Sequence, residues 1–294
     1  MGGPGEALAR AEALARRHYE NFPVAPWWLP ARLRRPLALI YAFARTADDL
    51  ADEGPAPPEA RREALRAYRA ALDRALEGRT AGEPEADPLL LALAEAVRTH
   101  GLPPQALHDL LSAFEQDTWK RRYATYAEVA DYCRRSAQPV GRLVLHLAGA
   151  ADPEALRRSD AVCTGLQLVN FLQDLAQDLE ENDRIYLPRD EMAACGVSEE
   201  DLRRRRVHPG LRRLLALQRK RARGLLLQGR GLGRRVGGRL GLQLALTVEG
   251  GLRVLELLET AADPFARPRL RRRDLPLLLA RLLGGRALQA GPAL

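Results

Sequence analysis

The chain has 294 residues, of which 46% are apolar and only 5% aromatic, and its formal net charge is +8. Such a chain can bury one large core, and its wealth of Ala, Leu and Arg favours helices over strands. The three cysteines show no zinc-binding or disulfide spacing, and neither a secretory leader nor an apolar run of membrane-spanning length is evident, so we expect a cytoplasmic protein.

Apolar residues recur with a helical period along almost the whole chain, and Pro- and Gly-rich stretches interrupt the pattern. The pattern predicts helices over residues 6–18, 31–53, 59–77, 89–100, 104–119, 125–149, 153–180, 198–206, 209–227 and 240–260. Pro264, Pro268 and Pro276 should break up the end. Since no linker separates self-sufficient halves, we predict one all-α domain over 1–294, with its core at about 18–274 and a loose tail at 288–294.

The first conspicuous pattern is an acidic face within the predicted helix 31–53. Tyr41, Arg45, Asp48 and Asp52 follow one another at spacings of four, three and four, so they form a single stripe. Two like charges one turn apart weaken an isolated helix, which suggests that a cation binds there. Carboxylates without His or Cys suit Mg²⁺, and an arginine beside them can grip a phosphate oxygen.

A second acidic face lies in the predicted helix 153–180. Asn170, Asp174 and Asp178 recur every fourth residue, and Gln167 precedes them on the same side. The helix before this stripe is apolar, so a row of Asn and Asp would be costly to bury unless a metal or another cation compensates it. Two such faces in one chain point to magnesium and diphosphate chemistry.

Each face also has a purely structural interpretation. The first could be a solvated helix end with an Arg45–Asp49 ion pair, and the second a surface face paired with Arg184 or Arg189. Arg184 itself either clamps a diphosphate or offsets the helix macrodipole, and Tyr186 either bonds a phosphate or packs in the core.

These motifs, in this order, resemble the squalene/phytoene synthases, a family of isoprenoid synthases with an all-α fold around a central cavity. The resemblance runs from about His18 to Asp274, and it rests on the segments 18–23, 41–45, 48–52, 136–143 and 170–188. Segments 20–24 and 136–143 are most similar to the hopanoid-pathway branch, often called squalene synthase. In that branch presqualene diphosphate and water give hydroxysqualene and diphosphate, and a separate flavoenzyme then makes squalene.

The resemblance implies roles for most of the candidate residues. A cluster of two or three Mg²⁺ ions would be held by Asp48, Asp52, Asn170, Asp174 and Asp178, of which the four aspartates are the catalytic set. Arg45 and Arg184 would hold diphosphate oxygens. The prenyl tunnel would be lined by Phe22, Tyr41, Ala137, Gly141, Cys163 and Gln167. Independently of the resemblance, His18 is the histidine considered for a substrate pocket, because it lies near Asn21 and Phe22, and Tyr186 is a further candidate for substrate binding.

Three positions depart from the family pattern in the same direction. Glu20 stands near a Lys or Ser of the enzymes that condense two farnesyl diphosphates, Gln173 stands where many relatives have Arg, and Gly250-Gly251 stands where many have a phosphate-binding Tyr. Each change removes a diphosphate-binding group, which favours a substrate with one diphosphate. No dinucleotide motif is visible, so no nicotinamide cofactor is expected.

Two alternatives remain open at this stage. Within the family, the chain could instead join two prenyl diphosphates head to head, giving presqualene diphosphate, squalene or phytoene. Outside it, the chain could be a non-catalytic basic helical module. Residues 200–294 contain 22 basic and 7 acidic residues, a net charge of +15. This charge predicts either a solvated helical face or peripheral contact with an anionic membrane at the inner face of the cell membrane. Binding of nucleic acid is not expected, because no recognised motif accompanies the charge.

Overall fold

The computed structural model describes residue 11 and residues 28–79 and 86–287. These residues are almost entirely helical, as predicted, and the extended backbone among them includes one isolated parallel bridge between Arg122 and Ile185. The helices gather into two compact units, one formed by residues 1–120 and 134–152 and the other by residues 121–133 and 153–294. Within the described residues, no helix combines the length and apolarity needed to cross a bilayer.

The first unit is built around α2 (Ala31–Asp52), which packs against α3 (Pro58–Leu76), α4 (Pro88–His100), α5 (Pro104–Asp117) and α7 (Gln138–Leu147). Local sequence sets the ends of these helices. Asp87 accepts a hydrogen bond from the N–H of Leu89 at 2.8 Å and so caps α4, while Gly101 ends that helix with φ of +58°. The buried face of α2 includes Leu37, Ile40 and Phe43, which turns the acidic stripe away from the core of this unit.

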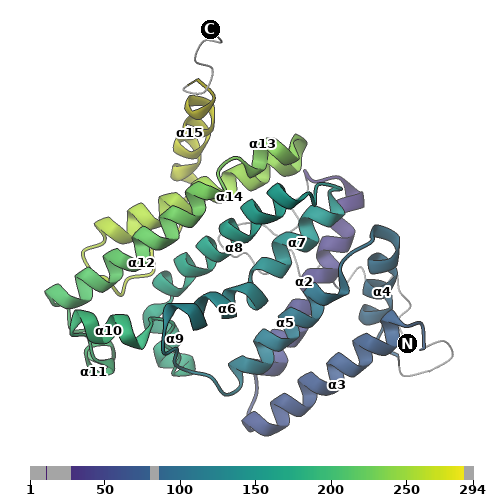
Figure 1. Ribbon diagram of the computed structural model, residues 1–294, viewed down its shortest axis with the longest axis horizontal. Coiled ribbons are helices and arrows are strands. Elements are labelled where there is room, and N and C mark those ends of the chain that lie inside the picture. The colour runs from purple at the N-terminus through teal and green to yellow at the C-terminus, as the bar shows by residue number, and fades with distance from the viewer. Residues whose placement is uncertain (1–10, 12–27, 80–85, 288–294) are drawn as a thin grey trace. The chain divides into compact units, whose positions relative to one another are not determined.

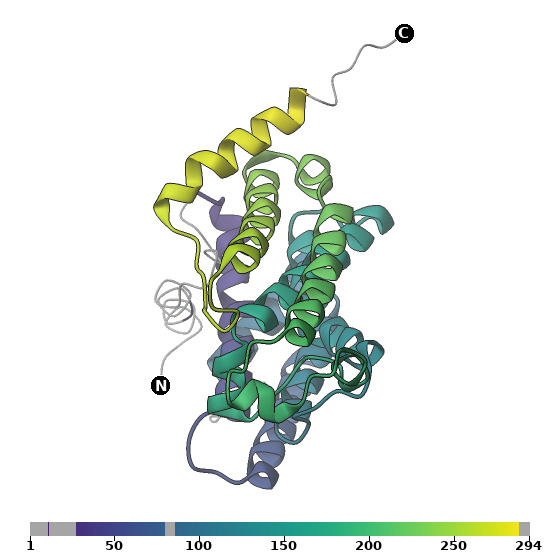
Figure 2. The ribbon, with the colours of Figure 1, turned by 90° about the vertical axis from the view of Figure 1, so that its left-hand side faces the viewer.

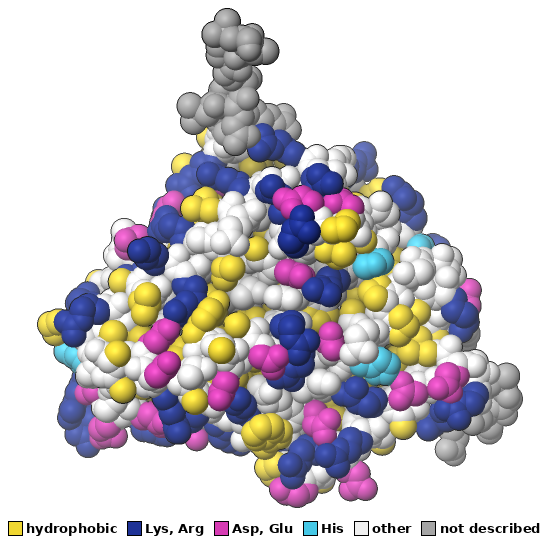
Figure 3. Space-filling view, viewed as in Figure 1, with side chains coloured by type: hydrophobic (Ala, Val, Ile, Leu, Met, Phe, Trp, Pro, Cys, Tyr) yellow, Lys and Arg dark blue, Asp and Glu magenta, His cyan; other side chains and the backbone are white. Residues whose placement is uncertain are grey.

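In the second unit α8 (Pro153–Gln173) packs against α12 (Pro209–Gln228) and α14 (Gly238–Thr260). Helices α12 and α14 also lie alongside each other in both ribbon views (Figures 1 and 2). The shorter elements are α9 (Leu175–Asn182), α10 (Arg189–Cys195), α11 (Glu199–Arg203), α13 (Leu232–Val236), the 3₁₀ turn η1 (Arg272–Asp274) and α15 (Leu275–Ala287). Most of α6 (Tyr126–Ser136) also belongs to this unit. Basic and acidic side chains are interspersed over the face seen in Figure 3.

The structure corrects three helix predictions. The helix expected over 125–149 is divided at Ala137, because Pro139 has no N–H to donate and its ring disfavours a continuous helix. The helix expected over 153–180 is divided at Asp174. Pro276 does not break the end, since it lies in the first turn of α15, where the missing N–H is tolerated.

Candidate active site

The first acidic face lies on α2 as one unbroken helical stripe, and Tyr41, Arg45, Asp48 and Asp52 are all half-buried. The Arg45 guanidinium is held by three carboxylates of its own helix end. It lies 3.2 Å from Asp48, 2.6 Å from Asp49 and 2.6 Å from Glu53. The Arg45–Asp49 pair of the structural interpretation therefore exists, and the same guanidinium also pairs with Asp48.

The end of α2 is fixed by a second arginine from the next helix. Arg61 of α3 donates to the carbonyls of Ala51 at 2.6 Å, Gly54 at 2.6 Å and Ala56 at 2.9 Å. Gly54 has φ of +85°, a conformation that glycine adopts without strain. Because three carbonyls converge on one planar fork of donors, the turn after the acidic stripe is held in one position.

The second acidic face continues across the break between α8 and α9. Asp174 has φ of −100° and ψ of 10°, yet its N–H still donates to the Asn170 carbonyl at 2.8 Å, and the Asp178 N–H donates to the Asp174 carbonyl at 2.7 Å. The hydrogen-bond ladder therefore survives at the residues of the motif. The local kink falls on Asp174, the first aspartate of the predicted metal site.

Asp174 and Asp178 are close enough to influence each other's ionisation. Burial and the neighbouring Asp174 charge raise the pKa of Asp178 to about 7, against the opposing effects of Arg184 and Arg267. Burial also raises the pKa of Asp174, although Arg267 and then Arg269 lower it. The nearby arginines do not fully offset burial and the repulsion between these two half-buried carboxylates, so their pKa values stay raised. A divalent cation would supply the missing positive charge, so the residues present fit such an ion.

Asp174 forms an ion pair with an arginine, Arg267, that no sequence pattern indicated. Arg267, in the loop between α14 and η1, pairs with Asp174 through Nε and donates from Nη2 to the second carboxylate oxygen at 3.0 Å. Its Nη1 donates to Gln177 at 2.8 Å. Arg189, which the surface interpretation named for this face, instead pairs with Glu199 at 3.2 Å.

Gln173, one of the three departures from the family pattern, has a structural role here. Its side chain is only 4% exposed, and its amide donates to the Pro268 carbonyl at 2.6 Å. Pro268 follows Arg267, so this bond holds the loop that carries the arginine against the end of α8. The residue that interrupts the expected pattern thus helps to place another cation beside the same aspartate.

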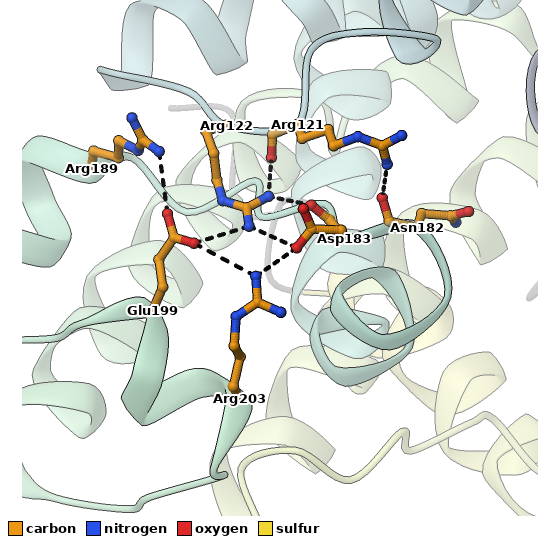
Figure 4. A network of polar contacts seen from close by, with 7 residues as sticks. All are labelled: Arg121, Arg122, Asn182, Asp183, Arg189, Glu199 and Arg203. Atoms are coloured by element: carbon orange, nitrogen blue, oxygen red, sulfur yellow. Dashed lines mark hydrogen bonds and ion pairs between the residues drawn. The ribbon is translucent and has the colours of Figure 1, made fainter. Parts of the chain in front are cut away.

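Arg184 is buried just beyond α9, and its backbone N–H donates to the Asp178 carbonyl at 2.9 Å. The turn between α9 and Arg184 is formed by Asp183 in the left-handed region, with φ of 49°. Figure 4 shows the ion-pair network that holds this turn. Arg122 lies 2.8 Å from Asp183 and 2.9 Å from Glu199, and Arg203 lies 2.7 Å from Asp183.

The backbone of the same turn is also held. Arg122 donates to the Asp183 carbonyl and Arg121 to the Asn182 carbonyl, and the Ile185 N–H donates to the Arg121 carbonyl at 3.0 Å. Hydrogen bonds from Arg122 lower the pKa of both Asp183 and Glu199, so both stay charged over a wide pH range. The segment 121–124 therefore sets the position of Arg184.

Tyr186 packs among aromatic rings. It stacks on Phe171 with 3.7 Å between ring centroids, and the rings of Tyr123 and Tyr132 lie 5.4 and 5.6 Å away. This is the core packing that one interpretation of Tyr186 predicted. A bond from its hydroxyl to phosphate stays a prediction.

The glycine at 251 also has a packing role. A Cβ there would come within 2.8 Å of Leu166 on α8 and 3.1 Å of Leu226 on α12, so the glycine lets α14 approach both helices. Gly165 of α8 meets Leu226 at 3.0 Å in the same way. Glycine at these positions is thus explained by helix packing, and a Tyr at 251 would not fit without rearrangement.

The remaining predicted lining residues are spread over several elements. Cys163 and Gln167 are half-buried on α8, Gly141 is half-buried on α7, and Ala137 lies at the break between α6 and α7. His18 and Phe22 lie outside the described residues. Among those that are described, no group of three or more His, Cys, Asp or Glu side chains is arranged to hold a metal alone.

The family model described as squalene/phytoene synthase matches residues 15–277. The chain belongs to this family. As a squalene/phytoene synthase family member it is an enzyme of isoprenoid biosynthesis. The family therefore argues against the alternative of a non-catalytic basic helical module. It is 40% identical to a hydroxysqualene synthase of Rhodopseudomonas palustris over 84% of this chain and 82% of that one.

Other relatives extend the comparison. A phytoene synthase of Thermus thermophilus is 37% identical over 78% of this chain and 76% of that one. Squalene synthase HpnC from Alicyclobacillus acidocaldarius is 40% identical and superposes with a TM-score of 0.78 over 86% of this chain and 93% of that one. A dehydrosqualene synthase structure, 20% identical with a TM-score of 0.79 over 97% and 98%, shows the same fold. The prediction of an all-α isoprenoid synthase fold is confirmed, while its central cavity and its single-domain boundaries stay predictions.

Proposed function

We propose that this family member is a hydroxysqualene synthase, which converts presqualene diphosphate and water into hydroxysqualene and diphosphate. The observation that carries this choice is the 40% identity, over most of both chains, to the Rhodopseudomonas palustris enzyme of that name. A Zymomonas mobilis protein of the same name is 34% identical over 84% of this chain. The structural use of Gln173 and Gly251 supports it, since neither position offers a phosphate-binding group.

Within this proposal, Asp48 and Asp52 on one face and Asn170, Asp174 and Asp178 on the other bind the magnesium that accompanies the diphosphate. Magnesium in such a site neutralises charge on the leaving diphosphate. Asp174 would give up Arg267 in order to bind the metal, and the raised pKa of Asp178 would fall. The number of ions, two or three, is part of the proposal.

The protein's own groups would then act on the substrate in sequence. Arg45 and Arg184 hold diphosphate oxygens, so that the C–O bond breaks with its charge already compensated. A tunnel lined by Phe22, Tyr41, Ala137, Gly141, Cys163 and Gln167 excludes stray water while the cyclopropylcarbinyl cation rearranges. One positioned water then attacks the carbocation, and the released diphosphate or a polar side chain takes its proton, which yields the alcohol.

A second candidate is head-to-head joining of two prenyl diphosphates, and one observation favours it. Arg267 lies on Asp174, and Arg269 is close enough to lower the pKa of that carboxyl. The second face therefore has more positive charge than its sequence suggested. The similarity to the Thermus thermophilus phytoene synthase points in the same direction.

Product analysis separates the two candidates. The purified protein is given presqualene diphosphate or farnesyl diphosphate, each with Mg²⁺ and with or without NADPH. We expect an alcohol from presqualene diphosphate with Mg²⁺ alone, incorporation of ¹⁸O from labelled water, and no effect of NADPH. Efficient formation of presqualene diphosphate from farnesyl diphosphate, or squalene made only with NADPH, would contradict the proposal.

Two further relations follow from the proposed reaction. An allylic alcohol product needs a reductive step to become a hydrocarbon, so a separate flavoenzyme would act next. Substrate and product are long hydrocarbons, and the basic C-terminal third suits peripheral contact with the anionic inner face of the cell membrane.

A further inference from the structure

Helix α15 presents a row of leucines to solvent. Leu275, Leu279 and Leu283 recur every fourth residue, so they lie on one stripe, and they are 48%, 40% and 64% exposed. Single exposed leucines are common on protein surfaces, but an aligned row of them on one helix marks an interaction surface.

The opposite side of α15 is attached to α14. Leu278 is buried, Arg281 of α15 lies 2.9 Å from Glu256 of α14, and Arg253 of α14 lies 3.0 Å from Asp274 at the start of the helix. These contacts fix the rotation of α15 about its own axis. The leucine stripe therefore faces away from α14, along a helix that extends beyond α12 and α14 in both ribbon views (Figures 1 and 2).

Basic side chains stand directly beside this stripe. Arg271, Arg272 and Arg273 are all exposed in the turn that leads into α15. Residues 267–287 contain seven arginines and one acidic residue, Asp274, which is buried against Arg253. Exposed leucines bordered by concentrated positive charge match the two layers of an anionic bilayer surface, its acyl chains and its phosphates.

We propose that α15 and the Arg271–Arg273 triplet form the surface by which the protein binds an anionic lipid bilayer. The leucines enter the boundary between headgroups and acyl chains, and the arginines bind lipid phosphates. A second copy of the chain fits less well, because a symmetric contact through this stripe would bring together two copies of segment 267–287, each with seven arginines and one acidic residue. The inference names the surface for the membrane contact proposed above, and it does not depend on which prenyl diphosphate is the substrate.

The test is co-sedimentation of the whole protein with two kinds of vesicle. One kind contains phosphatidylcholine alone, and in the other about one lipid in three is the anionic phosphatidylglycerol. One variant combines Leu275→Ser, Leu279→Ser and Leu283→Ser, and a second combines Arg271→Gln, Arg272→Gln and Arg273→Gln. Each has a matched control. Leu217→Ser, Leu227→Ser and Leu242→Ser change exposed leucines on α12 and α14, and Arg204→Gln, Arg205→Gln and Arg206→Gln change another exposed arginine triplet.

We expect the α15 leucine variant and the triplet variant each to bind anionic vesicles at least about tenfold more weakly than the unmodified protein, while both controls lose less than about threefold. Equal losses in variants and controls would overturn the proposal in favour of a diffuse charge effect. If all four variants bind vesicles as tightly as the unmodified protein, another surface makes the contact and the proposal is wrong. If the unmodified protein binds no vesicles, the membrane contact itself is refuted as well. If the leucine variant converts a dimer to a monomer in light scattering, the stripe is a self-association surface and the proposal fails.

Discussion

The two acidic faces are similar in sequence, but they obtain their support from different distances along the chain. On α2, Arg45 contacts carboxylates no more than eight residues away, and Arg61 fixes the helix end from the next helix. On α8 and α9, Asp174 is bound by Arg267, 93 residues later, and the following turn is held by Arg122, 61 residues earlier. The contacts that support the first face are thus local in sequence, whereas those that support the second form only after distant segments of the chain have come together.

If both faces serve one diphosphate, both should be indispensable despite this difference. We expect Asp48→Asn and Asp174→Asn each to lower turnover at least about 100-fold without unfolding the protein, because each removes a charge from the magnesium shell. Steady-state rates with Mg²⁺, together with circular dichroism, measure this. Asp109→Asn on α5 is the matched control and should keep its rate. Near-normal rates for either site variant would mean that only one face takes part.

The turn beyond the second face should be the more vulnerable one to loss of a single arginine. Arg122 is 14% exposed and bonds both carboxylates and carbonyls, so Arg122→Met should lower the free energy of unfolding by about 2–3 kcal/mol. Arg189 belongs to the same network but is 60% exposed, and Arg189→Met should cost no more than about 0.5 kcal/mol. Urea denaturation compares the two, and equal effects would show that burial is not what gives Arg122 its importance.

The second face should also respond to pH in a way that follows from Asp178. Its pKa of about 7 means that Mg²⁺ must displace a proton below that pH, so magnesium affinity should rise about tenfold from pH 6 to pH 8. A raised carboxyl pKa stabilises the folded metal-free protein at low pH, and this stabilisation is lost as the pH rises from about 4 towards 7. Calorimetric Mg²⁺ titrations test the affinity, with Asp178→Asn as the variant that should lose the dependence. A flat profile in the unmodified protein would contradict it.

The smallest expected effect concerns Arg267, the arginine from a distant segment that pairs with Asp174. Arg267 neutralises Asp174 while no metal is bound, so Arg267→Gln should tighten Mg²⁺ binding in the absence of substrate by a few-fold, roughly 2–5 times. Thermal shift measured against Mg²⁺ concentration gives the apparent affinity. Arg223→Gln removes an arginine paired with Glu259 and serves as the control. Weaker Mg²⁺ binding in the Arg267 variant would mean that the arginine supports the metal rather than competing with it.

The sequence was sufficient for what is local. The spacing of Tyr41, Arg45, Asp48 and Asp52 predicts a stripe on one helix, and the structure has it on α2. The kink at Asp174 was not visible, because the residues around it are ordinary helix formers with neither Gly nor Pro among them. Arg267 could not be distinguished from its neighbours, since it is one of many arginines in the C-terminal third and only the fold brings it to Asp174.

The pairing of segment 121–124 with residues 185–190 has a consequence for how the protein is made. Three backbone hydrogen bonds join them, from the N–H groups of Ile185, Arg189 and Asp190 to the carbonyls of Arg121, Tyr123 and Ala124. On the ribosome the earlier segment emerges first, so its carbonyls must wait for about 60 more residues before these partners exist. Closing a loop of that length makes the step entropically slow. Until then Tyr123, fully buried in the finished protein, lacks the ring of Tyr186 on which it stacks, and nascent chains stalled in this interval should depend on chaperones.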